Sequence, residues 1–89
     1  MHTIYKYALQ PLREQTISMP DSATILTVQM QGDTITLWAE VHDDNRPENR
    51  TFEVFGTGWH ITPLECEREY IGTVQDRSGL VWHIYERVK

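Results

Sequence analysis

The run from Gly56 to Trp59, read Gly-Thr-Gly-Trp, is the stretch whose residue types best suit ligand binding. Two glycines around a threonine allow successive backbone N–H groups to point at one anion. The Thr57 hydroxyl adds a hydrogen-bond donor, and the Trp59 ring adds a surface on which a base can stack. The chain is therefore predicted to hold a small anionic ligand of nucleotide type. The predicted ligand-binding residues are Gly56, Thr57, Gly58, Trp59 and Arg50, the last as the source of positive charge.

A structural explanation of the same glycines stays open. Two glycines at the end of a strand also mark a bulge or a sharp bend where a sheet turns a corner. A phosphate-binding P-loop needs a lysine and a helix after its glycines, and neither follows here, so nucleotide hydrolysis is not expected. Lys6 and Arg68 are two further cations that could meet an anion.

The residues that could perform catalysis do not form a competent set. Cys66 lies between Glu65 and Glu67, and adjacent carboxylates disfavour the reactive thiolate. The histidines, none of them paired at the spacing of metal ligands, are His2, His42, His60 and His83. The sequence therefore predicts a protein that is not an enzyme and that holds no metal and no cofactor.

Aromatic residues are numerous for so short a chain, with three Trp, four Tyr and two Phe in 89 residues. Trp38 alternates with Leu37 and Ala39, so it lies on the polar face of its strand, where it marks a second packed layer or a contact surface. A small domain cannot bury all of this aromatic area. We therefore expect a homo-oligomer or a bound partner, although core positions for the tryptophans stay possible. The predicted interface residues are Trp38, Trp82 and Tyr85.

Alternating apolar residues from Ser22 to His42 predict a β-hairpin around a two-residue turn at Gly32 and Asp33. That turn sets the pairs Gln31–Thr34, Met30–Ile35, Val28–Leu37 and Leu26–Ala39. A second hairpin is expected from Tyr70–Gln75 and Leu80–Val88, joined by a turn over 76–79. The remaining predicted segments are strands at Thr3–Leu9, Gln15–Met19 and Arg50–Phe55, a polar loop at His42–Asn49, and one helical turn at Pro63–Arg68. The predicted fold is all-β, a small antiparallel sandwich or open barrel of six or seven short strands.

Length and charge limit the classes of function. Eighty-nine residues predict one domain covering 1–89. The net charge of −5 argues against binding to a nucleic acid duplex, since such binders are usually basic. No apolar run reaches the roughly 18 residues of a membrane span, so no membrane partner is expected. The first residues do not resemble a secretion signal, which predicts a cytoplasmic protein.

Short motifs are spread along almost the whole chain. In chain order they are Ile4-Tyr5-Lys6-Tyr7, Met19-Pro20, Ala23-Thr24-Ile25-Leu26, Val28-Gln29-Met30-Gln31, Leu37-Trp38-Ala39, Arg50-Thr51-Phe52, Gly56-Thr57-Gly58, Tyr70-Ile71-Gly72-Thr73 and Val81-Trp82-His83. Their order and spacing resemble a family of small phage and prophage proteins of unknown function. The resemblance implies a phage origin and a site of action in the cytoplasm of an infected bacterium. It implies no activity.

These observations together predict a non-enzymatic phage accessory protein that acts by binding in the host cytoplasm. Its partner would be a host protein that it inhibits, or a small anionic ligand, such as a nucleotide-type signal, that it sequesters as a form of counter-defence. The alternative is a structural component of the phage particle, built from β-domains that assemble by symmetric contacts.

Overall fold

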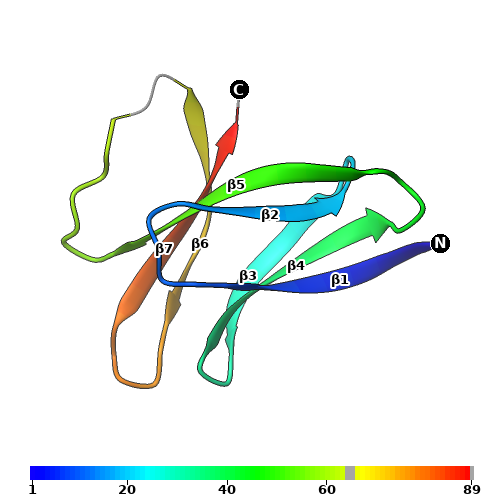
Figure 1. Cartoon of the computed structure of the whole chain (residues 1–89). Helices are drawn as coiled ribbons and strands as arrows, with labels where there is room; N and C mark the ends of the chain where they lie inside the picture. The colour runs from blue at the N-terminus through cyan, green and yellow to red at the C-terminus, as the bar shows by residue number, and fades with distance from the viewer. Residues whose placement is uncertain (64–65, 89) are drawn as a thin grey trace.

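The computed structural model describes residues 1–63 and 66–88 and contains seven strands in that part of the chain (Figure 1). The strands are β1 (His2–Leu9), β2 (Gln15–Pro20), β3 (Thr24–Gln31), β4 (Thr34–His42), β5 (Pro47–Gly56), β6 (Glu67–Gln75) and β7 (Val81–Val88). The predicted all-β class and number of strands are confirmed. No helix long and apolar enough to span a bilayer occurs in these residues.

The strands form two antiparallel sheets that stay open and do not close into a barrel. The three-stranded sheet has the order β1-β4-β3, and the four-stranded sheet has the order β2-β5-β7-β6. Figure 1 shows β2 and β5 crossing over the three-stranded sheet, with the turns of the β3–β4 and β6–β7 hairpins at the same end of the molecule. Edge strands β3 and β6 approach each other so closely that a Cβ added to Gly72 would lie 2.7 Å from Val28 Cγ1.

The first hairpin has the predicted turn and most of the predicted register. Gly32 has φ +60°, which glycine adopts without strain, and Gln31 pairs with Thr34. The predicted partner of Ala39 is wrong. Ile25 takes that position in place of Leu26, since the register shifts between Ile25 and Thr27. The irregularity leaves Leu26 45% exposed.

The second hairpin also forms, with β7 between β5 and β6 in its sheet. The Asp76 carboxylate accepts hydrogen bonds from the backbone N–H groups of Ser78 and Leu80, at 2.9 and 3.0 Å, and so holds the turn. Leu80 was expected within the strand, but β7 begins at Val81 and Leu80 is exposed.

Two predicted segments differ from the structure. The polar loop ends earlier than expected, because Pro47–Asn49 already belong to β5 and pair with β2. The predicted helical turn at Pro63–Arg68 falls partly on residues 64–65, which lie outside the described part of the chain. Its last two residues, Glu67 and Arg68, are in β6, where they pair with β7.

The core lies between the inner faces of the two sheets. Five of its side chains are completely buried and come from both sheets: Leu37 and Ala39 on β4, Phe52 and Val54 on β5, and Ile84 on β7. Alternate residues of β4, β5 and β7 therefore face inward, and those between them face outward. The outward residues of β4 include Trp38, those of β5 include Glu53, and those of β7 include His83 and Tyr85.

Candidate functional site

The turn after β5 uses its backbone donors within the protein. Thr57 N–H donates to the Val81 carbonyl at 3.3 Å, and Trp59 N–H donates to the Gly56 carbonyl at 3.0 Å. Gly58 has φ +88°, a conformation that favours glycine. Two of the backbone N–H groups predicted to bind an anion are therefore already used within the protein, and the glycines turn the chain at the end of the sheet.

Gly56 is required by close packing. A Cβ added at this position would lie 2.8 Å from Trp59 Nε1 and 2.9 Å from Trp59 Cε2. The indole of Trp59 lies against the Gly56 backbone, so only a residue without a side chain fits beneath it.

We expect Gly56→Ala to displace the Trp59 ring, because contacts this short are not tolerated. The measurable result is a change in tryptophan fluorescence and near-UV circular dichroism while the far-UV spectrum is retained. Gly32→Ala is the control: its added Cβ meets nothing within 4 Å, although φ +60° strains it, so the tryptophan signals should stay as in the wild type. Unchanged tryptophan signals in Gly56→Ala would contradict the packing.

Side chains on the outer face of the four-stranded sheet form a continuous hydrogen-bond chain. The Thr57 hydroxyl lies 2.8 Å from His83 Nε2, and the Thr73 hydroxyl lies 3.0 Å from His83 Nδ1. Tyr70 Oη contacts the same Thr73 hydroxyl. Both imidazole nitrogens are therefore occupied by hydroxyl groups. The arrangement resembles a nucleophile, base and orienting group in order, yet no carboxylate belongs to it.

Trp59 has partners on its faces and edge. The Arg13 guanidinium lies 5.1 Å from the centre of a Trp59 ring, a cation–π distance, and Arg13 Nη1 donates to the His60 carbonyl at 3.2 Å. Trp82 meets Trp59 edge to face, with centroids 5.5 Å apart. Trp59 is 39% exposed, and a stacking base would have to displace Arg13. Among the described residues Arg13 has no carboxylate partner. The sequence did not indicate that Arg13 lies beside Trp59.

The cations predicted to meet an anion have partners inside the protein. Arg50 makes a two-point ion pair with Glu86, through Nε at 2.6 Å and Nη2 at 2.8 Å, and it also donates to the Ala23 carbonyl. The hydrogen bonds to Glu86 raise the pKa of Arg50 above its ordinary value. The Lys6 ammonium donates to Gln31 Oε1 at 2.7 Å. The structure does not bring Arg50 beside the turn at Gly56; it places Arg50 between the sheets.

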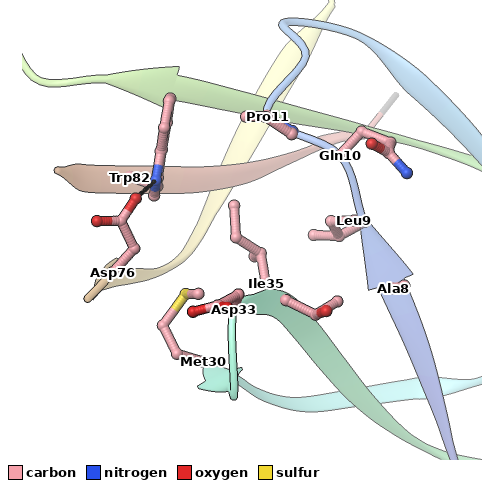
Figure 2. A pocket seen from close by; sticks show the side chains of 10 residues that line it. Ala8, Leu9, Gln10, Pro11, Met30, Asp33, Ile35, Asp76 and Trp82 are labelled. Carbon is pink, nitrogen blue, oxygen red and sulfur yellow. Dashed lines mark hydrogen bonds between the residues drawn. The ribbon is translucent and has the colours of Figure 1, made fainter. Parts of the chain in front are cut away.

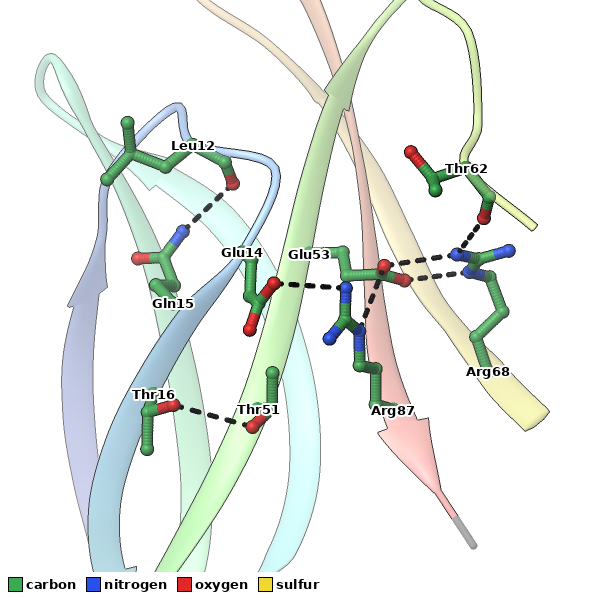
Figure 3. Close-up of polar contacts among 9 residues, drawn as sticks. All are labelled: Leu12, Glu14, Gln15, Thr16, Thr51, Glu53, Thr62, Arg68 and Arg87. Carbon is green, nitrogen blue, oxygen red and sulfur yellow. Dashed lines mark hydrogen bonds and ion pairs between the residues drawn. The ribbon is translucent and has the colours of Figure 1, made fainter. Parts of the chain in front are cut away.

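Arg68, the third predicted cation, is paired with the buried carboxylate of Glu53, which the sequence did not indicate as a partner. Glu53 is 1% exposed on the outer side of β5, and it accepts from Arg68 at 2.7 and 3.1 Å and from Arg87 at 3.2 Å (Figure 3). Arg68 also donates to the Thr62 carbonyl at 2.8 Å, and Arg87 lies 3.3 Å from Glu14. The cluster of Glu53 and its two arginines therefore ties β5, β6 and β7 to two loops.

Burial opposes ionisation of Glu53, and the hydrogen bonds from Arg68 and Arg87 outweigh it, so the pKa of Glu53 lies below its ordinary value. The only signal for this in the sequence is one acid in the apolar run Phe52-Glu53-Val54-Phe55. That signal indicates a buried acid but does not identify the arginines that neutralise it.

The three predicted interface residues lie in different environments. Trp82 faces inward at the end of the core, half-buried, and its indole N–H donates to Asp76 at 3.1 Å. Tyr85 packs edge to face with Phe55 and Tyr70 on the outer side of the four-stranded sheet. Trp38 is half-buried on the outer side of the three-stranded sheet, where it pairs with Lys6 on one neighbour and Thr27 on the other.

A hollow of about 210 Å³ lies at the end of the sandwich, between the chain after β1 and the two hairpin turns (Figure 2). Leu9, Met30 and Ile35 provide its apolar side, and Asp76 lies beside Trp82. Hydrogen bonds from Ser78 and Trp82 lower the pKa of Asp76, so this carboxylate stays charged. The hollow is acidic, which does not suit the anion predicted from the sequence.

The family model described as Domain of unknown function (DUF7352) matches residues 1–89. The chain belongs to this family. Comparison with curated proteins and with solved structures found no match. In this DUF7352 domain, the described residues contain no group of three or more His, Cys, Asp or Glu side chains placed to hold a metal ion.

The geometry of the DUF7352 domain thus separates two kinds of surface. The outer face of the four-stranded sheet is occupied by its own side chains, through the hydroxyl–imidazole chain and the Glu53 cluster. The outer face of the three-stranded sheet has no third layer over it in the described chain, and Trp38 lies at its centre. That face is the surface most suited to an external partner.

Proposed function

We propose that this DUF7352 domain is a non-enzymatic binding protein whose partner is another protein, held by the outer face of the three-stranded sheet. One observation supports the proposal above all. Trp38 lies half-buried on the central strand of the three-stranded sheet, on a face that no other strand covers in the described part of the chain. Ile4, 56% exposed, faces the same side, since its partner Glu40 is two residues from Trp38 on β4. Tryptophan surrounded by polar groups is the usual composition of an interface hot spot.

A protein partner fits the geometry better than a small anion does. Arg50, Arg68 and Lys6 each have a partner within the chain, so the charge expected for sequestering an anion is largely used. Arg13, which lies over the ring of Trp59, is the guanidinium at the predicted binding turn that supports the anion hypothesis. Trp59 is 39% exposed, so these two residues form an open surface and do not enclose a nucleotide.

The resemblance of the sequence to small phage and prophage proteins supports a more specific proposal. In that setting the domain acts in the cytoplasm of an infected bacterium, where it binds and inhibits a host protein. Its net charge of −5 favours a partner with a basic surface. Assembly into the phage particle is the alternative to this role.

We expect a photo-crosslinking amino acid at Ile4 to capture one protein from a bacterial lysate, and Trp38→Ala in the same chain to reduce that capture about thirtyfold. The reason is that a central tryptophan contributes about 2 kcal/mol or more to binding, which corresponds to roughly that factor. The measurement is quantitative mass spectrometry of crosslinked products from the full chain.

The matched control places the crosslinker at Tyr70, which is 57% exposed on the other sheet, in a chain that keeps Trp38. Equal capture from Ile4 and Tyr70, or capture that is insensitive to Trp38→Ala, would contradict a role for this face. Native mass spectra of the same samples test the anion hypothesis, since a bound small molecule would appear as an added mass. Recovery of the chain in purified phage particles would support the structural role.

A further inference from the structure

The two sheets have four edge strands, and three of them are protected. Strands β3 and β6 approach each other closely, and each has an irregular register, at Ile25/Thr27 and at Tyr70/Gly72. Strand β2 has six residues and ends in Pro20, which has no N–H to donate. Bulges, short length and proline are the usual features that prevent pairing with another chain. Strand β1 has none of them.

Strand β1 presents a long, regular free edge. Its eight residues, His2–Leu9, pair with β4 without a register shift, and they include no proline. Ile4 is 56% exposed and Tyr5 is 40% exposed. Lys6 is the one side chain on this strand that could guard the edge with a full charge. Its ammonium instead crosses β4 to reach Gln31 on β3, at 2.7 Å.

We propose that β1 pairs antiparallel with β1 of a second copy of this chain, around a twofold axis at Tyr5. The two three-stranded sheets then form one continuous sheet. Residues directly opposite each other must lie on the same face, which limits the twofold axis to a residue rather than a point between two residues.

The length of the pairing and charge together select Tyr5 as the residue on the axis. An axis at Tyr5 or at Lys6 pairs seven residues of β1 with the second copy, and every other axis pairs fewer. An axis at Lys6 sets two ammonium groups opposite each other. An axis at Tyr5 sets Lys6 opposite Ile4 of the second copy and joins the two Tyr5 rings as an aromatic cross-strand pair. Because residues 2–9 contain no Asp or Glu, β1 itself offers no acid that would attract the Lys6 of another copy at a different register.

This inference rests on the edge of the sheet and not on the proposed protein partner. It adds to the proposed function, because a twofold axis perpendicular to the sheet sets both copies of Trp38 on the same side of the continuous sheet. A dimeric partner or a repeated surface would then meet two binding faces at once.

The test measures the mass of the full chain in solution by light scattering. The wild type is expected at twice the 10.5 kDa of one chain. Tyr5→Lys and Tyr5→Glu should each be monomeric, because each sets like charges opposite each other on the axis. An equimolar mixture of the two variants should recover the dimer, which shows that both variants are folded and that position 5 meets itself.

Leu26→Lys is the matched control, since it adds the same charge at a position 45% exposed on edge strand β3. It should remain dimeric. A wild type that is monomeric at every concentration measured overturns the inference, as does a dimer that survives Tyr5→Lys. A dimer lost in Leu26→Lys but kept in Tyr5→Lys would assign the contact to β3. In this dimer a crosslinker at Ile4 lies opposite Lys6 of the second copy, so it would also join two copies of this chain. Mass spectrometry distinguishes that product from a crosslink to a different protein, and only the second product tests the proposed function.

Discussion

Arg68→Met is expected to lower the free energy of unfolding by about 3 kcal/mol, the lower end of the range for breaking a buried ion pair. The variant leaves Glu53, 1% exposed, with Arg87 as its only cation and without the two shortest hydrogen bonds to its carboxylate. For a domain of this size the loss corresponds to a fall in melting temperature on the order of 15 °C. Urea titration and thermal unfolding measure both quantities.

Arg77→Met is the matched control for the loss of an arginine. Arg77 and Asp33 lie 3.4 Å apart, but both side chains are 77% exposed, so this pair adds little to stability. We also expect the double variant with Glu53→Met and Arg68→Met to be more stable than Arg68→Met alone, because it removes a buried carboxylate that would keep only its contact with Arg87. An Arg68→Met variant no less stable than Arg77→Met would contradict the importance of the Glu53 cluster.

The pH dependence of stability provides a second measure of the same cluster. Since the pKa of Glu53 is lower in the folded chain than its ordinary value of 4.5, the unfolded chain binds the proton more tightly. The contribution of Glu53 is therefore fully present above about pH 4.5 and is lost as the pH falls through the folded pKa. The wild type should lose stability over that acid range more steeply than the double variant lacking Glu53 and Arg68.

The fold could be predicted because its signals are local. The turn at Gly32 and Asp33 and the alternation on both sides of it determine the pairing of Val28 with Leu37 without reference to the rest of the chain. The irregularity near Leu26 could not be predicted in this way. It lies near the approach of β6, where Gly72 lies against Val28, and no pattern within β3 records that neighbour.

The candidate site was harder to predict, because charge in a sequence does not show its partner. Arg50 and Glu86 are 36 residues apart, and Arg68 and Glu53 are 15 apart. Each pair meets only when the strand order places β7 between β5 and β6, which the sequence did not reveal. Residue types indicated Thr57 and Trp59 as candidate ligand-binding residues. They could not show that His83 and Arg13 contact these two residues from other elements.

Arg50→Met is expected to destabilise the protein by about 3 kcal/mol, although Arg50 was first identified as a candidate for binding an anion. The variant leaves Glu86, 7% exposed, without its two-point partner, and it also leaves the Ala23 carbonyl without a donor from Arg50. Urea titration of the full chain gives the loss. Adding Glu86→Met to Arg50→Met should recover part of it, since no unpaired carboxylate then remains.

The comparison with Lys6→Met separates a structural role from a ligand-binding role. Lys6 makes one exposed hydrogen bond to Gln31, so its loss should change stability by a few tenths of a kcal/mol at most. If Arg50 existed to bind an anion, Arg50→Met would resemble Lys6→Met in stability and would differ only when a ligand was added. A large loss in the absence of any ligand instead identifies Arg50 as the cation that neutralises Glu86 between the sheets.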